Sequence, residues 1–97
     1  MKAQRFYQYA VAKYPQSTAR IARALVYYRQ GRVTQLAPNR YTVRGSHTYD
    51  VDLETHTCTC IDAVEGKAPQ VALTATGQLV YGCKHWFAAI MARIGLE

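Results

Sequence analysis

Three cysteines and a histidine, arranged as two close pairs, are the side chains of this sequence best suited to chemistry. Cys58 and Cys60 are two positions apart, Cys83 and His85 are also two apart, and the chain has no further cysteine. Side chains two apart in an extended segment project to the same side, so the thiolates of the first pair converge on one point. Residues two apart in a helix face away from each other, so we expect Cys83 just before a helix and His85 in its first turn.

Three thiolates and one neutral imidazole form a closed tetrahedral ligand set, which is typical of structural zinc and leaves no position for water or substrate. The sequence therefore predicts one structural Zn²⁺ at these four residues. The excess negative charge of three thiolates is opposed by Lys84, between two ligands, and by the positive end of the following helix. Two alternatives stay open: a disulfide between Cys58 and Cys60, which would close a cramped ring, or free buried thiols, which would not require the nearby histidine.

The order Cys-x-Cys, a variable segment, then Cys-x-His resembles the SWIM zinc finger, and Cys83-Lys84-His85 is a frequent form of its second half. Upstream, residues 31–33, 41–46 and 49–53 resemble the strands that precede the first ligand pair in that family. The resemblance covers about residues 31 to 94. Asp62 matches an acidic position of the family, whereas Ile61 stands where proline is common and the segment between the ligand pairs is longer.

The resemblance implies that Cys58, Cys60, Cys83 and His85 are the zinc ligands. Proteins with SWIM fingers include transposases, chromatin-remodelling ATPases and recombination factors, so it also implies a role around DNA. SWIM domains serve protein contacts as well. A protein-interaction adaptor for a DNA-processing partner is therefore the alternative function.

Basic residues are concentrated in the first half of the chain, whose overall formal net charge is +6. Residues 1–44 contain no Asp or Glu, and their basic residues are Lys2, Arg5, Lys13, Arg20, Arg23, Arg29, Arg32, Arg40 and Arg44. All the acidic residues lie in residues 45–97, where they outnumber the basic ones. This asymmetry favours a polyanionic partner for the first half, most simply nucleic acid, and the SWIM resemblance implies that this is DNA.

Two amino-terminal helices are expected, over residues 2–14 and 18–30, with Ser17 as the N-cap of the second and Gly31 after its end. An apolar stripe on the second helix is formed by Ile21, Ala24, Leu25 and Tyr28. We expect Arg20, Arg23 and Tyr27 on its opposite side. Basic residues interleaved with an aromatic can hold phosphates and stack on bases, although a solvated helix face is the alternative. The candidate nucleic-acid contacts are Arg20, Arg23, Tyr27, Arg29, Arg32, Arg40 and Arg44.

Three short strands are expected next, over residues 33–36, 40–44 and 48–53, because apolar residues alternate there and turn residues separate the runs. They should form an antiparallel meander covered by helices. Asp50 and Asp52 share its other face, where plain surface is favoured over acid–base chemistry or a cation site. His56 is a reserve ligand or supporting group for the metal, and His47 is surface.

Residues 70–74 and 78–81 are expected to form a small hairpin around a turn at residues 75–77, inserted between the ligand pairs. The hairpin is either a decoration or an element that contacts a partner. A final helix over residues 84–94 is apolar almost all round. Part of it should pack on the sheet and the zinc site, and the remainder on the first two helices or, alternatively, on a protein partner or a second copy of the chain.

These expectations describe an α+β fold in one domain, residues 1–97, with a basic helical part (1–30) and a zinc-binding part (31–97). No apolar run approaches the ~20 residues of a membrane span, and the amino terminus does not resemble a signal peptide. We therefore expect an intracellular, cytoplasmic protein without a membrane partner. No catalytic motif is apparent and a closed zinc site activates no water, so neither an enzyme nor a small-molecule substrate is expected.

Overall fold

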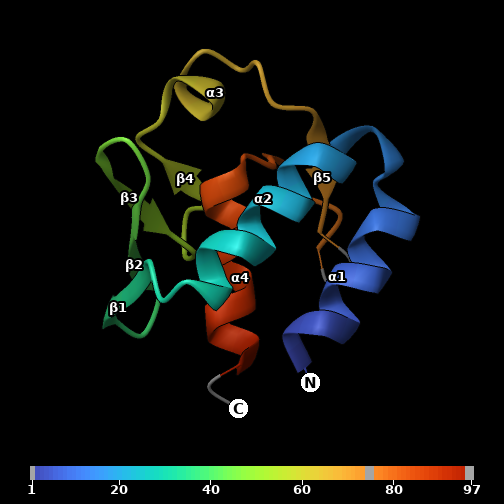
Figure 1. Cartoon of the computed structure of the whole chain (residues 1–97). Helices are drawn as coiled ribbons and strands as arrows, with labels where there is room; N and C mark the ends of the chain where they lie inside the picture. The colour runs from blue at the N-terminus through green and yellow to red at the C-terminus, as the bar shows by residue number, and fades with distance from the viewer. Residues whose placement is uncertain (1, 74–75, 96–97) are drawn as a thin grey trace.

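Helices lie at both ends of the chain, and antiparallel strands lie between them, in the computed structural model, which describes residues 2–73 and 76–95 (Figure 1). The elements in chain order are α1 (Lys2–Lys13), the 3₁₀ turn η1 (Pro15–Ser17), α2 (Thr18–Arg29), β1 (Val33–Ala37), β2 (Arg40–Arg44), β3 (Thr48–Asp52), β4 (Thr57–Cys58), α3 (Ile61–Val64), β5 (Gln70–Ala72), β6 (Leu79–Tyr81) and α4 (Lys84–Gly95). The expected α+β layout is confirmed.

The main sheet has four antiparallel strands in the order β1-β2-β3-β4. Its register opposes Tyr41 to Val51 and Val43 to Tyr49. Tyr41, Val43 and Val51 are buried, whereas Arg40 and Arg44 on the alternate positions of β2 are exposed. The period-two pattern of the sequence therefore separates a core face from a solvent face. The short strand β4, which the sequence did not predict, adds Cys58 beside Val51.

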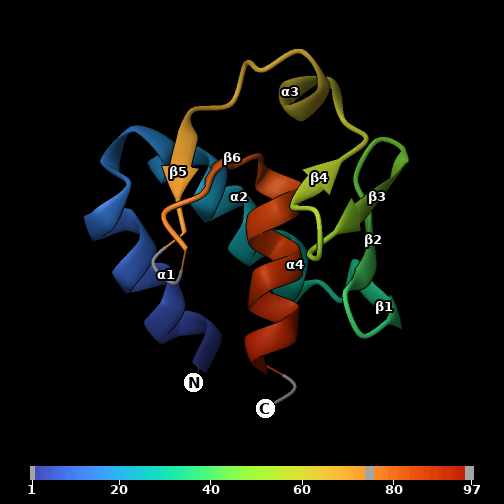
Figure 2. The ribbon, with the colours of Figure 1, turned by 180° about the vertical axis from the view of Figure 1, so that it is seen from behind.

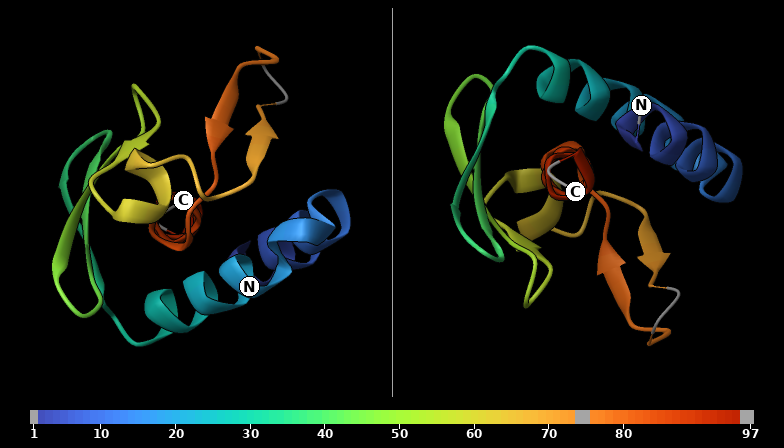
Figure 3. Two further views of the ribbon diagram at one scale, coloured as in Figure 1. Left: turned by 90° about the horizontal axis from the view of Figure 1, so that it is seen from above. Right: turned by 90° about the horizontal axis from the view of Figure 1, so that it is seen from below.

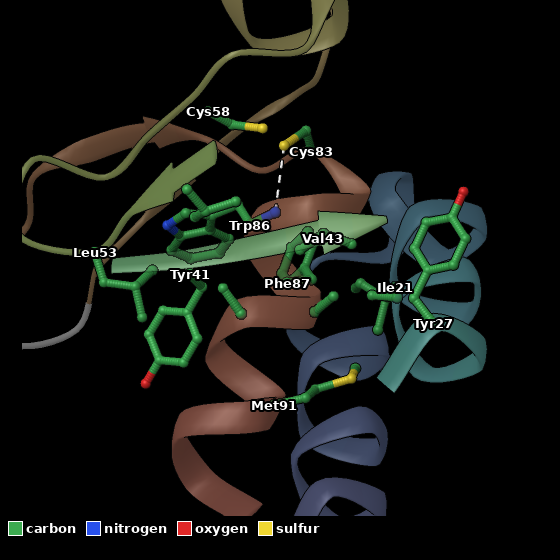
Figure 4. Close-up of a cluster of buried hydrophobic side chains, with 14 of the residues drawn as sticks. Ile21, Tyr27, Tyr41, Val43, Leu53, Cys58, Cys83, Trp86, Phe87 and Met91 are labelled. Carbon is green, nitrogen blue, oxygen red and sulfur yellow. Dashed lines mark hydrogen bonds between the residues drawn. The ribbon is translucent and has the colours of Figure 1, made fainter. Parts of the chain in front are cut away.

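Helix α4 occupies the middle of the molecule, with the main sheet and the α1–α2 pair on different sides of it (Figure 3). Its buried residues are His85, Trp86, Phe87, Ala88, Ala89 and Met91. Figure 4 shows Phe87 and Met91 among side chains from the sheet and from α2. Contacts within the chain thus account for the apolar residues around most of α4.

The start of α2 differs from the prediction. Ser17 stands at the N-cap position, but its side chain caps no amide, and its buried hydroxyl has no hydrogen-bond partner within the described residues. The 3₁₀ turn leads directly into α2, and Thr18 Oγ1 donates to the carbonyl of Pro15 instead. The predicted capping role of Ser17 is therefore wrong, because a 3₁₀ turn, and not an extended segment, precedes the helix. Gly31 follows the helix with φ +70°, as the expected end signal requires.

The inserted hairpin is confirmed as the antiparallel pair β5–β6, which lies apart from the main sheet (Figure 2). Thr74 and Ala75, which were included in the expected strand and turn, lie outside the described residues. The hydroxyl of Tyr14 donates to the carbonyl of Ala72 at 2.9 Å and ties the hairpin to the end of α1. None of the described helices is long and apolar enough to cross a lipid bilayer.

Candidate metal centre

The four predicted ligands come together. One potential ligand atom from each of Cys58, Cys60, Cys83 and His85 lies within 4.8 Å of the others, and all four residues are buried. Cys58 comes from β4, Cys60 directly precedes α3, Cys83 precedes α4, and His85 lies in the first turn of α4. We call these four residues the Cys–His cluster. It can hold one metal ion.

Local backbone structure explains how the second pair reaches the cluster. Cys83 lies outside α4, and its sulfur accepts a hydrogen bond from the amide of Trp86 at 3.3 Å. Gly82 passes so close to the core that a Cβ there would meet the ring of Phe87 at 3.0 Å and Val71 at 3.2 Å. The chain can turn into α4 at this point because residue 82 has no side chain.

The separation of one sulfur and one ring nitrogen in the cluster is compatible with a tetrahedral ion. Cys58 Sγ lies 3.8 Å from His85 Nδ1. Metal–ligand distances of about 2.0–2.3 Å place neighbouring ligand atoms of a tetrahedron about 3.5–3.8 Å apart. The remaining ring nitrogen of His85, Nε2, is buried and has no hydrogen-bond partner within the described residues. Nδ1 is therefore the nitrogen positioned for a metal.

Without a metal, the cluster holds its protons. The hydrogen bond with Cys83 and burial raise the pKa of Cys60 to about 12. The hydrogen bond with Cys58, together with burial, raises the pKa of Cys83 to about 12. Burial lowers the pKa of His85, which favours the neutral imidazole that metals bind. Metal binding must therefore displace protons from thiols but not from the imidazole.

Two tyrosines position the His85 ring. Tyr49 from β3 stacks on it with ring centroids 4.2 Å apart, and Tyr27 from α2 lies parallel to it at 5.9 Å. A Cβ at Gly45 would meet Tyr27 Oη at 3.3 Å, Tyr49 at 3.6 Å and His85 Nε2 at 3.7 Å. The sheet, its turn and α2 thus all contribute to the orientation of one ligand.

The expected exposure of Tyr27 is wrong. Its side chain is only 9% exposed, and it belongs to the core beside Ala24. The buried arc of α2 is wider than the predicted stripe because α2 packs on α4. Tyr27 follows Ala24 by three positions, so helical spacing does place it on the flank of that stripe. Its ring is not available for stacking on a base.

Arg20 is also engaged within the chain. Its Nε and a terminal nitrogen donate to the two carboxylate oxygens of Asp62 at 2.7 and 2.8 Å. The hydrogen bond from Arg20 lowers the pKa of Asp62, and the same pair raises the pKa of Arg20. The ion pair fastens α3, which the sequence did not predict, to α2 beside the Cys–His cluster. No sequence signal joins two residues that lie 42 positions apart.

The other arginines predicted to contact nucleic acid lie on different parts of the surface. Arg29 donates to the side chain of Gln4. Arg32 and Arg44 line one hollow on the sheet, whereas Arg40 lines another that also contains Asp50 and Asp52. Arg23 is exposed and lines a cleft with Arg20 and Lys84. Most of these basic residues therefore line three separate depressions of the surface, and Arg40 shares its depression with two carboxylates.

His56 does not join the Cys–His cluster. It lies in the turn before β4 with φ +56°, and its Nδ1 accepts a hydrogen bond from Trp86 Nε1 at 3.3 Å. The reserve-ligand interpretation is thus wrong, because the turn directs His56 to the tryptophan. Asp52 accepts hydrogen bonds from the amides of Glu54 and Thr55 and so shapes the same turn.

No protein-family model, no curated protein and no solved structure matches this chain.

Proposed function

We propose that this chain is a small module in which one structural zinc ion organises the fold and a basic part of its surface binds nucleic acid, with DNA favoured. The zinc part is supported by the donor set. Three sulfurs and one imidazole nitrogen suit zinc better than magnesium or calcium, which prefer oxygen. All four donors belong to the chain, so the ion has a structural role.

The nucleic-acid part rests mainly on one surface feature, which we call the Arg32–Arg44 hollow. It has a volume of about 250 Å³ and is lined by Gly31, Arg32, Thr34, Thr42, Arg44 and Thr48. Two guanidinium groups and three hydroxyls are groups that proteins use to contact phosphate oxygens. No carboxylate of residues 2–73 or 76–95 lines the hollow.

Arg32 is held in place at this hollow. Its guanidinium lies over the ring of Tyr27 at 5.9 Å, and Nη1 donates to the carbonyl of Arg44 at 3.4 Å. A side chain that is already restrained loses less entropy when it binds a phosphate. Tyr27 therefore contributes to nucleic-acid binding through Arg32 and not by stacking on a base.

The opposite end of the same strand provides a contrast. Arg40, Thr42 and Arg44 alternate along the solvent face of β2, but Arg40 lines a hollow with Asp50 and Asp52. These carboxylates repel phosphates and offset the charge of Arg40. We therefore expect the nucleic acid at the Arg44 end of the strand.

The test is a fluorescence-anisotropy titration of the zinc-loaded protein with single- and double-stranded DNA at several salt concentrations. Arg44→Gln should reduce the slope of log affinity against log salt by about 0.9 for duplex DNA and about 0.7 for a single strand, the value of one lost phosphate contact. Arg40→Gln is the matched control, since it removes the same charge from the same strand. Equal losses in both variants, or no binding at low salt, would contradict the proposal.

The SWIM resemblance supports the same function, because the Cys–His cluster lies after strands and before a helix, as the family pattern implies. The proposed membership of that family rests on the ligand spacing and on residues 31–94.

Protein adaptor is the second candidate function, and it is supported by exposed apolar side chains. Val64 of α3 is 70% exposed, and Leu79 of β6 is 59% exposed. The apolar residues of α4 are largely covered by the chain itself, so α3 and the hairpin are the better surface for a partner. Failure to bind any DNA, combined with full zinc content, would favour this function.

A further inference from the structure

A second basic site lies beside the Cys–His cluster. It is a cleft of about 370 Å³ lined by Ala19, Arg20, Arg23, Asp62 and Lys84. These residues belong to α2, α3 and the first turn of α4. The segment that contains α3 passes over the amino-terminal end of α4 in both side views (Figures 1 and 2). We call this the Arg23–Lys84 cleft.

The charges of the cleft do not cancel. Asp62 is its one carboxylate among the described residues, and both oxygens of that carboxylate accept hydrogen bonds from Arg20. Arg23 and Lys84 form no ion pair within residues 2–73 and 76–95. Two cationic side chains are therefore left to face the cleft, while the third is already neutralised.

Lys84 is directed to the cleft by its position as well as its charge. It lies between Cys83 and His85, whose side chains are buried in the Cys–His cluster, whereas Lys84 remains half-buried at the surface. Lys84 and Asp62 line the same cleft, so a ligand held there meets both charges.

The lining also limits what the ligand can be. Within the part of the chain that the structure describes, Ala19 is the only apolar residue of the cleft, and no aromatic ring lines it. The cleft can therefore recognise charge but cannot stack on a base or hold an apolar group. Two amides in the first turn of α4 are already used, because Trp86 and Phe87 donate to Cys83. The charged side chains of the cleft favour an anion as its ligand.

We propose that the Arg23–Lys84 cleft binds a phosphate group of the nucleic-acid partner, while Asp62 keeps Arg20 occupied and sets the charge of the site. This proposal rests on the proposed nucleic-acid function, but it concerns a site separate from the Arg32–Arg44 hollow. Phosphate is favoured over a carboxylate because the first half of the chain is so strongly basic.

The first experiment uses ¹⁵N NMR of the zinc-loaded protein and three probes. Inorganic phosphate should shift the amide signals of Ala19, Arg23 and Lys84, and acetate at matched ionic strength should not. Two oligonucleotides, one with a 5′-phosphate and one without, then distinguish the source. Shifts with both identify an internal phosphate, and shifts only with the first identify a terminal one. Shifts with inorganic phosphate alone would overturn the nucleic-acid part of the proposal, and no shifts would overturn all of it.

Substitutions test which side chains hold the phosphate. Arg23→Gln should weaken phosphate binding about three- to fivefold, the effect of one charge at a partly exposed site. Arg40→Gln, its matched control on the sheet, should leave phosphate binding unchanged. Lys84→Gln should act like Arg23→Gln, and it is compared only when its zinc content is complete. Equal effects of Arg23→Gln and Arg40→Gln would overturn the proposal.

Asp62→Asn should change phosphate affinity in the opposite direction. Removing this carboxylate releases Arg20 and leaves three cations at the cleft, so phosphate binding should strengthen about three- to fivefold. Asp50→Asn is the control, since it changes the net charge equally at an exposed position on the sheet. Equal strengthening in both variants would show a general charge effect and overturn the assignment. DNA binding that depends on Arg44 would survive that result, so the two proposals can fail separately.

Discussion

The His85 ring makes two contacts that fix its orientation. Its Nδ1 faces the sulfur of Cys58, and the ring of Tyr49 stacks on its face. His56 offers a comparison within the same chain, because it hydrogen-bonds to Trp86 and lies outside the Cys–His cluster. At the scale of single residues, the metal proposal therefore predicts that substituting His85 lowers zinc affinity and that substituting His56 does not.

His85→Gln should lower zinc affinity by about 100-fold or more, since even the loss of a group that only supports a ligand costs 10–100-fold. His56→Gln should keep full zinc content and lose only its hydrogen bond with Trp86. The measurement is metal content after dialysis against a weak chelator. Equal retention in the two variants would remove His85 from the ligand set.

The protonation state of the thiols predicts how zinc affinity depends on pH. In the metal-free cluster the pKa of Cys60 and that of Cys83 are raised to about 12, so both thiols are protonated at neutral pH. Each must lose a proton when the metal binds. Log affinity should therefore rise by about two or more per pH unit between pH 7 and 9, measured by competition with a chelator. A slope below one would contradict thiolate ligation by these two residues.

The residue scale is also where sequence reasoning was most and least successful. The convergence of Cys58 with Cys60, and of Cys83 with His85, could be predicted because side chains at this spacing can face one point. The pairing of Arg20 with Asp62 and the burial of Tyr27 could not, because both depend on how α2 packs against elements far away in the sequence. Helical periodicity assigns a face to a side chain but does not say how wide the buried part of that face is.

At the scale of elements, the first turn of α4 depends on a glycine. Gly82→Ala would place a methyl group 3.0 Å from the ring of Phe87, which is fully buried and cannot move freely. We expect a loss of about 1–3 kcal/mol in the free energy of unfolding, the usual cost of overpacking a core. Gly45→Ala is the control, because its closest contact is 3.3 Å and involves the tip of Tyr27. Chemical denaturation of both variants measures the difference, and equal losses would contradict the argument.

The attachment of α3 can be measured in the same way. Arg20 and Asp62 are 30% and 23% exposed and share two hydrogen bonds. A double-mutant cycle with Arg20→Gln and Asp62→Asn should therefore give a coupling free energy of about 1 kcal/mol, at the upper end for partly exposed pairs. A coupling near zero would mean that the ion pair does not hold α3 to α2.

The elements themselves were predicted well where one physical pattern dominated. The alternation of Tyr41, Val43 and Val51 fixed the meander, and Gly31 marked the end of α2. The one-turn helix α3 was missed because four residues are too few for a periodic pattern. The N-cap role predicted for Ser17 was wrong because a serine side chain can also lie buried in a 3₁₀ turn.

At the scale of the whole molecule, α4 connects the Cys–His cluster to everything else. It carries one ligand, follows another directly, and packs on α1, α2 and the main sheet. A chain of 97 residues has a modest core, and structural zinc contributes on the order of 10 kcal/mol of apparent binding energy at neutral pH. Loss of the metal should therefore disrupt structure beyond the Cys–His cluster.

Chelation of the metal consequently predicts a loss of structure in which two different signals change together. Trp86, the only tryptophan, reports on the core beside the cluster through its fluorescence, and far-UV circular dichroism reports mainly on the three long helices. Both signals should be lost over the same range of chelator and recovered over the same range of added zinc, because α4 is shared by the cluster and the α1–α2 pair. If fluorescence changed while the helical signal stayed, α1 and α2 would fold without the metal, and the cluster would organise only residues 31–95.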